Sequence, residues 1–218
     1  KTNIYLGDCF EITAKVRERF SPTVGFLNPP YKSKKSDIEE LDFVLNNLNT
    51  LVKGGKCLAI VPLSCAISIK GEILERKKKI LENHTLEAIM SMPEDLFHNS
   101  KVSVVTCVFV ITAHIPHPKG KKTWLGYWRE DGFVKTKQMG RTDLYDRWPA
   151  IKERWLEAYL NNEVHPGESV TAYVTDEDEW LAEAYLETDY SDLKESDFEK
   201  VVRDFAIFKL TNRFEDQK

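Results

Sequence analysis

The segment 28–31, with the sequence Asn-Pro-Pro-Tyr, constrains the fold of this 218-residue chain more than any other stretch. It follows the apolar run 24–27 and precedes a lysine-rich stretch at 32–35. Each proline fixes its own φ at about −65°, and it moves the preceding residue towards extended geometry. Because neither proline has an N–H group to donate, the strand predicted at 24–27 ends here. A rigid loop at the carboxyl end of a strand is where open α/β sheets bind their ligands.

This NPPY motif places two hydrogen-bond acceptors next to an aromatic ring. The Asn28 amide oxygen and the Pro29 carbonyl can accept both hydrogens of one exocyclic NH2 group, while Pro30 keeps the turn rigid. The flat ring of Tyr31 suits the face of a base. Accepting both hydrogens frees the nitrogen lone pair, so the nitrogen becomes nucleophilic without a general base. The alternative is an ordinary Pro-Pro loop that carries a surface tyrosine.

The residues after the motif predict one unit of a parallel sheet. We expect a helix from Ser36 to Val52, because Ser36 and Glu39 have the capping-box spacing and an apolar stripe follows at helical spacing. The apolar run 57–61 then predicts a strand that is buried on both faces. Strand, helix and strand in this order form a right-handed crossover. The patterns further along predict a helix at 71–82, strands at 85–90 and 102–111, and a hairpin at 123–138 around an Asp-Gly turn.

The NPPY motif at the end of an apolar strand resembles the catalytic motif of N6-adenine DNA methyltransferases, in particular the group that includes the modification subunits of type I restriction systems. Two other landmarks stand in the right order for this family: the segment 7–10, and Phe97 before its strand. The resemblance covers residues 3–140. It implies an α/β fold with a partial Rossmann-like sheet, parallel with an antiparallel edge hairpin, and an α-helical C-terminal region.

The resemblance further implies site-specific DNA adenine methylation as part of a restriction-modification system. In that reaction the target adenine leaves the double-stranded DNA and is clamped by two rings, here Tyr31 and Phe97. Its N6 donates hydrogen bonds to the Asn28 side chain and the Pro29 carbonyl, and it attacks the methyl group of S-adenosylmethionine. Phe97 has a second interpretation, as a core phenylalanine beneath a loop.

The resemblance assigns residues to the cofactor and to DNA as well. Asp8 and Phe10 match positions near the adenine of S-adenosylmethionine, close to Asn28, although Asp8 is equally explained as the N-cap of a helix at 11–20. Lysines around the two loop tips are the candidates for DNA phosphates. They are Lys32, Lys34, Lys35 and Lys101, and a basic segment with Lys135, Lys137 and Arg141 follows the hairpin. The run Arg76–Lys79 indicates a solvated helix face.

The chain departs from the family at its start. The glycine-rich cofactor loop and the acidic ribose-binding residue that follows it are missing, since the adjacent glycines Gly54 and Gly55 follow a helix instead of preceding one. We therefore expect residues 1–140 to be the C-terminal part of a methyltransferase catalytic domain, and residues 141–218 to be a mostly helical, acidic extension. We expect this fragment to be inactive in isolation. Its expected partners are the missing N-terminal methylase half and the specificity and restriction subunits of such systems.

Composition argues against a membrane protein, a secreted protein and a metal-binding protein. No apolar run approaches the roughly 18 residues that span a membrane, and no signal-peptide pattern opens the sequence. Four scattered cysteines indicate buried thiols in a reducing compartment, so we predict a cytoplasmic protein. A metal site is not expected, because His114 and His117 are interrupted by prolines and have no carboxylate or cysteine nearby. A net charge of -4 argues against a protein that binds nucleic acid with its whole surface, but it is compatible with a local basic groove.

Two other functions fit the same motif. One is methylation of glutamine side chains in proteins, and the other is methylation of RNA bases. Both kinds of substrate also present an NH2 group, so the motif does not distinguish them from adenine in DNA. A non-enzymatic alternative is an inactive scaffold that binds a specificity or nuclease subunit.

Overall fold

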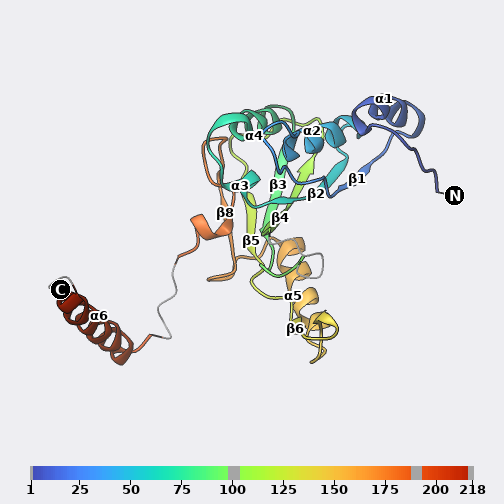
Figure 1. Cartoon of the computed structure of the whole chain (residues 1–218). Helices are drawn as coiled ribbons and strands as arrows, with labels where there is room; N and C mark the ends of the chain where they lie inside the picture. Colours follow the sequence, from blue (N-terminus) through green and yellow to red (C-terminus); the bar gives the residue numbers. More distant parts are fainter. Residues whose placement is uncertain (1, 98–103, 188–192, 216–218) are drawn as a thin grey trace. The chain divides into compact units, whose positions relative to one another are not determined.

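The computed structural model describes the backbone of residues 2–97, 104–187 and 193–215 (Figure 1). The chain divides into two compact units, Lys1–Leu186 and Glu187–Lys218. The first unit contains all the described strands, and the second contains the helix α6, Glu195–Glu215. No helix of the described residues is long and apolar enough to cross a membrane.

A six-stranded mixed sheet with the strand order β1-β2-β4-β3-β5-β8 forms the first unit. β1 pairs with β2 in parallel, and β3 pairs with β5 in parallel, whereas β4 lies antiparallel between β2 and β3. β8 closes the sheet antiparallel to β5. The strands are β1 (Val24–Leu27), β2 (Lys56–Pro62), β3 (Thr85–Ser91), β4 (Thr106–Thr112), β5 (Thr123–Tyr127) and β8 (Ser169–Ala172).

Four of these strands run in the same direction, which positions the candidate site. The loops that follow β1, β2, β3 and β5 leave the sheet at one edge, and the antiparallel β4 begins at that edge, where Pro62 and Ser91 face its first residues. We call this edge the loop edge. Segments that are far apart in the sequence, including the NPPY motif and the loop before β4, therefore meet there.

Helices cover both faces of the sheet (Figure 1). On one face, Leu41, Val44 and Leu48 of α2 and Ile80 of α4 are fully buried against the strands, so the stripe predicted for α2 is confirmed as core. On the other face, Ala158 of α5 packs in a cluster with Met90, Val110 and Trp124. The helices are α1 (Cys9–Phe20), α2 (Glu40–Thr50), α3 (Ser64–Ile67), α4 (Gly71–Asn83) and α5 (Trp148–Asn161), with a 3-10 turn, η2, at Ala182–Ala184.

The start of α2 differs from the prediction. Ser36 does not cap it, because the helix begins four residues later, after Glu39. The Asp37 carboxylate instead accepts hydrogen bonds from the backbone and hydroxyl of Ser33 and from the backbone of Lys34. This carboxylate closes residues 33–37 into a turn that competes with the first helical turn.

The hairpin predicted at 123–138 is wrong, although the sheet does end in an antiparallel strand. β5 is buried from Thr123 to Gly126 and pairs with β3 on one side and β8 on the other, so it has no edge left for a hairpin partner. The Asp-Gly turn leads instead to β6 (Val134–Thr136), which pairs with β7 (Gly140–Thr142) in a separate two-stranded sheet.

The predicted domain boundary at residue 140 does not coincide with the division at residue 186. β8 completes the sheet, and Trp180 is fully buried against Phe109, with the ring centroids 5.9 Å apart. The predicted acidic extension therefore supplies apolar side chains, including Trp180 and Leu181, to the core. The expected helical character is present in α5 and α6.

Candidate functional site

The NPPY motif lies at the loop edge, directly after β1. Leu27, the last residue of β1, is in register with Ala59 in the buried strand β2, so the sheet fixes where the motif begins. Pro29 is buried, whereas Asn28 and Pro30 are exposed. The motif is anchored through one proline and presents the amide of Asn28 to solvent.

Tyr31 folds back onto Asn28. Its hydroxyl donates a hydrogen bond to Oδ1 of Asn28 across 3.1 Å. Burial raises the pKa of the Tyr31 phenol, and the nearby Glu40 carboxylate acts in the same direction. The phenol therefore keeps its proton and remains a donor to the amide oxygen, which has a second lone pair for another donor.

Phe97 lies against Tyr31, so the two residues predicted to clamp a base are in contact with each other. The ring centroids are 6.3 Å apart and the planes are nearly perpendicular, at 87°. Phe97 is half-buried at the tip of the turn that follows β3, so it is accessible from solvent. A base can enter between the two rings only if they separate and turn parallel.

The lysines predicted to bind DNA fall into different environments. The Lys32 ammonium is bonded to Glu39 and lies 3.5 Å from Glu72, while its backbone N–H donates to Glu40 across 2.6 Å. These contacts hold the backbone directly after Tyr31, and the two carboxylates neutralise the charge of the Lys32 ammonium. Lys34 and Lys35 are exposed. Lys101 lies outside the described residues.

Asp8 is the N-cap of α1, which is the second of its two predicted roles. One carboxylate oxygen accepts from the backbone N–H of Phe10 across 2.8 Å. The Phe10 ring packs on Phe43 with the centroids 5.1 Å apart and is 38% exposed. The second carboxylate oxygen and the open face of the ring are of the types that suit a nucleoside. Among the described residues, no strand runs into a glycine-rich turn and a helix.

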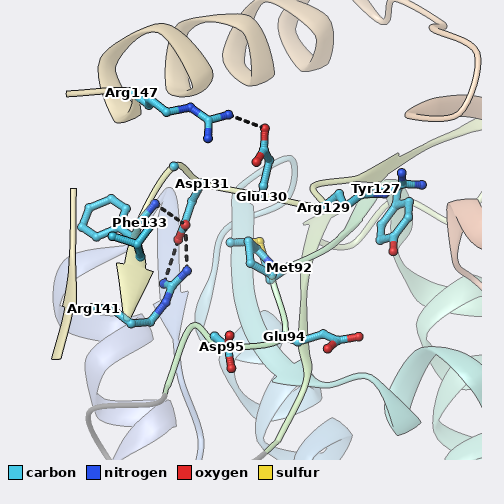
Figure 2. A pocket seen from close by; sticks show the side chains of 13 residues that line it. Met92, Glu94, Asp95, Tyr127, Arg129, Glu130, Asp131, Phe133, Arg141 and Arg147 are labelled. Carbon is cyan, nitrogen blue, oxygen red and sulfur yellow. Dashed lines mark hydrogen bonds and ion pairs between the residues drawn. The ribbon is translucent and has the colours of Figure 1, made fainter. Parts of the chain in front are cut away.

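The structure contains a pocket at the loop edge that the sequence did not predict (Figure 2). It has a volume of about 380 Å³ and is lined by the segments 92–95 and 129–134, together with Tyr127, Arg141 and Arg147. Arg141 was predicted to face DNA, but it pairs with both carboxylate oxygens of Asp131 at 2.7 and 2.8 Å and is largely buried. The segments meet only through the order of the strands, a non-local arrangement that leaves no local sequence signal.

With this geometry established, comparisons with known proteins identify the class. The first unit is a mixed α/β sheet with an aromatic pair and an asparagine at the loop edge. The family model described as N-6 DNA Methylase matches residues 9–209. The chain therefore belongs to the N-6 DNA methylase family.

Relatives agree with this assignment. The chain is 32% identical over 216 residues to the type II restriction enzyme and methyltransferase RM.BcgI of Heyndrickxia coagulans, covering 96% of this chain and 33% of that protein. Its fold matches a chain in a structure describing assembly of a type I restriction-modification system, with a TM-score of 0.59, 17% identity, and coverage of 100% of this chain and 50% of the other. It also matches the type I methyltransferase subunit from Streptococcus thermophilus, with a TM-score of 0.56, 18% identity, and coverage of 71% and 35%. This chain thus spans about a third of the length of the curated relative.

Proposed function

We propose that this chain is the base-binding and catalytic part of a DNA methyltransferase that transfers a methyl group to N6 of an extruded adenine within a restriction-modification system. The observation that carries the proposal is the contact between Tyr31 and Phe97 beside Asn28. An aromatic pair next to a hydrogen-bond acceptor suits a flat base that carries an NH2 group. Membership of the N-6 DNA methylase family supports the same reaction.

Each group of the motif has a defined task in this proposal. Tyr31 and Phe97 bind the two faces of the adenine, and stacking of about 1–3 kcal/mol per base offsets the cost of extrusion. Asn28 and the Pro29 carbonyl accept the N6 hydrogens, which concentrates the lone pair on nitrogen. The buried Pro29 keeps the acceptors in place, so no reorganisation is needed as charge develops.

S-adenosylmethionine, when bound, supplies an electrophilic methyl group. Asp8 and Phe10 are the residues of this chain that would contact it, next to Asn28. Further residues must complete the site, because the described part of the chain lacks the glycine-rich loop. We propose that the completing segment packs beside β1, since β1 is the edge strand of the sheet. Its residues Val24 and Phe26 are 63% and 70% exposed, an apolar surface that another layer can cover.

The test is methyl transfer by the complete natural polypeptide that carries this sequence, together with its subunits. Duplex DNA with adenine is compared with RNA and with a glutamine-containing peptide. Asn28→Ala should lower turnover about 100-fold or more and change DNA affinity much less. Normal turnover in Asn28→Ala, or transfer to the peptide or the RNA instead of DNA, would overturn the proposal.

A second test concerns the cofactor. We expect calorimetry to show S-adenosylmethionine binding to the complete polypeptide, and little binding to residues 1–218. If the complete polypeptide does not bind it either, the inactive-scaffold alternative is favoured.

A further inference from the structure

The pocket in Figure 2 shares no lining residue with the proposed base site of Asn28, Tyr31 and Phe97. One wall is the segment Met92–Asp95, which continues the chain from β3 towards Phe97. The other wall follows β5 and turns into the β6–β7 ribbon. Asp95 and Phe97 are two residues apart, so their Cα atoms are within about 7 Å of each other. The wall that contains Asp95 is therefore within reach of a nucleotide that neighbours an adenine held at Phe97.

Most of the charges around the pocket are already paired. Arg141 binds Asp131, and Arg147 lies 2.7 Å from Glu130, as the dashed lines of Figure 2 show. Lys135 of β6 pairs with the lining residue Asp95 at 2.6 Å. These pairs contribute no net charge, and the pair of Lys135 with Asp95 ties the β6–β7 ribbon to the loop that carries Phe97.

Two charged side chains that line the pocket form no ion pair within the described part of the chain. They are Arg129 and Glu94. The Arg129 guanidinium lies 5.0 Å from the centre of the Tyr127 ring, which supports its flat face and leaves its N–H edge available. Arg129 and Glu94 come from different walls and both are exposed.

We propose that this pocket receives the nucleotide of the target strand that neighbours the methylated adenine, with Arg129 pairing its phosphate and Glu94 accepting a hydrogen bond from an N–H group of its base. A guanidinium edge matches two phosphate oxygens, and a carboxylate is an acceptor for base amino groups. A volume of about 380 Å³ falls within the range of small-ligand pockets. This inference rests on the proposed function, because it extends the same DNA strand from the base site.

The experiment uses the complete natural polypeptide with its subunits, and duplexes in which single phosphates around the target adenine are replaced by neutral methylphosphonates. In the unaltered protein, one replacement next to the adenine should weaken binding about ten-fold. In Arg129→Gln the same replacement should have no further effect, because the two changes remove one contact. Arg154→Gln is the matched control, since Arg154 is an exposed arginine paired with Glu168.

The phosphate scan of Arg129→Gln decides the role of Arg129. If Arg129→Gln stays as sensitive as the unaltered protein at every phosphate, the inference is overturned. Glu94→Leu should leave the phosphate scan unchanged but reduce discrimination among bases at the flanking position, and unchanged discrimination overturns the role of Glu94. Unaltered melting temperatures exclude misfolding as the cause.

Methyl transfer measured on the same duplexes keeps the inference distinct from the proposed function. Transfer to adenine that persists while the phosphate scan ignores Arg129 defeats the inference alone. Absence of transfer by the unaltered protein defeats the proposed function, and the inference fails with it.

Discussion

The Tyr31 hydroxyl and the Asn28 amide oxygen are joined by a hydrogen bond of 3.1 Å, so the ring that would bind the base also orients the group that would activate it. A phenol is protonated at physiological pH, and burial raises the pKa of Tyr31 further, so the hydroxyl remains a donor. Aromatic binding and acceptor geometry are therefore coupled through one side chain.

This coupling predicts the behaviour of Tyr31→Phe. The variant keeps the ring but loses the hydrogen bond, so kcat should fall about ten-fold while affinity for DNA changes little. Tyr31→Leu loses the stacking surface too, and it should also weaken base extrusion, by about 1–3 kcal/mol. Methyl transfer and fluorescence of 2-aminopurine at the target position measure the two effects. Equal kcat values for Tyr31→Phe and the unaltered enzyme would show that the hydroxyl does not orient Asn28.

Glu40 is a positioning residue for the motif. It is 4% exposed, and it accepts the backbone N–H of Lys32, directly after Tyr31. Glu40→Ala leaves that N–H without its partner, so we expect the free energy of unfolding to fall by about 1.5–3 kcal/mol and kcat to fall more than DNA affinity.

Glu40→Gln is the matched control, because its amide oxygen can still accept the hydrogen bond. Recovery of kcat and of stability in Glu40→Gln is the expected result. If Glu40→Gln is as impaired as Glu40→Ala, the carboxylate charge matters and the positioning role is wrong.

The sequence predicted correctly those features that depend on interactions between neighbouring residues. The NPPY motif marked the end of β1 correctly, because proline geometry depends on adjacent residues. The apolar stripe of α2 followed from periodicity, and the apolar run 57–61 marked the strand β2. Burial on both faces of β2 was wrong, since Leu58 and Ile60 on one face are only partly buried. The pairing of Tyr31 with Phe97 came from the family resemblance, since nothing in either segment alone brings the rings together.

Competing contacts explain the predictions that were wrong. The Asp-Gly turn at residues 131–132 indicated a hairpin with β5, but β5 already has two partners in the sheet. Ser36 had the spacing of a helix cap, but Asp37 closed an earlier turn. Lys77 was expected on a solvated face, and it is instead fully buried. In each case a distant or competing contact outweighed the local preference.

The buried Lys77 predicts a stability effect. Its ammonium donates to the carbonyls of Ala66, Ser68 and Asp178 and lies 4.5 Å from the centre of the Trp180 ring, joining the α3 region to the acidic stretch. Lys77→Met keeps the volume but leaves these carbonyls without a donor. We expect a loss of about 2–3 kcal/mol in the free energy of unfolding, measured by urea denaturation at pH 7.

The same residue predicts a pH dependence. Burial lowers the pKa of Lys77 to about 8. Between about pH 8 and the ordinary lysine pKa of 10.5, the unfolded chain binds more protons than the folded one, so stability rises with pH through this side chain. The buried thiols act in the opposite direction, so the quantity to measure is the difference between the unaltered protein and Lys77→Met. A difference that does not vary with pH in this window would contradict the lowered pKa.

His84 provides a separate test on the acid side. The ring is 3% exposed, its Nδ1 accepts the backbone N–H of His114 across 3.0 Å, and burial, followed by the charge of His114, lowers its pKa to about 4. The folded state therefore holds His84 neutral, whereas the unfolded chain protonates it near pH 6.5. The stability this provides is complete above pH 6.5 and is lost as pH falls towards 4.

His84→Asn isolates this contribution, because the asparagine oxygen can replace Nδ1 as acceptor and does not titrate. We expect the variant to lose less stability than the unaltered protein between pH 6.5 and 4 in urea titrations. His117, whose pKa is lowered by burial, contributes in the same direction in both proteins, so it cancels in the comparison. The Glu87 carboxylate, with a pKa lowered to about 2, loses its contribution only below its ordinary value of 4.5. Parallel stability curves for the two proteins across this window would mean that His84 is not held neutral by the fold.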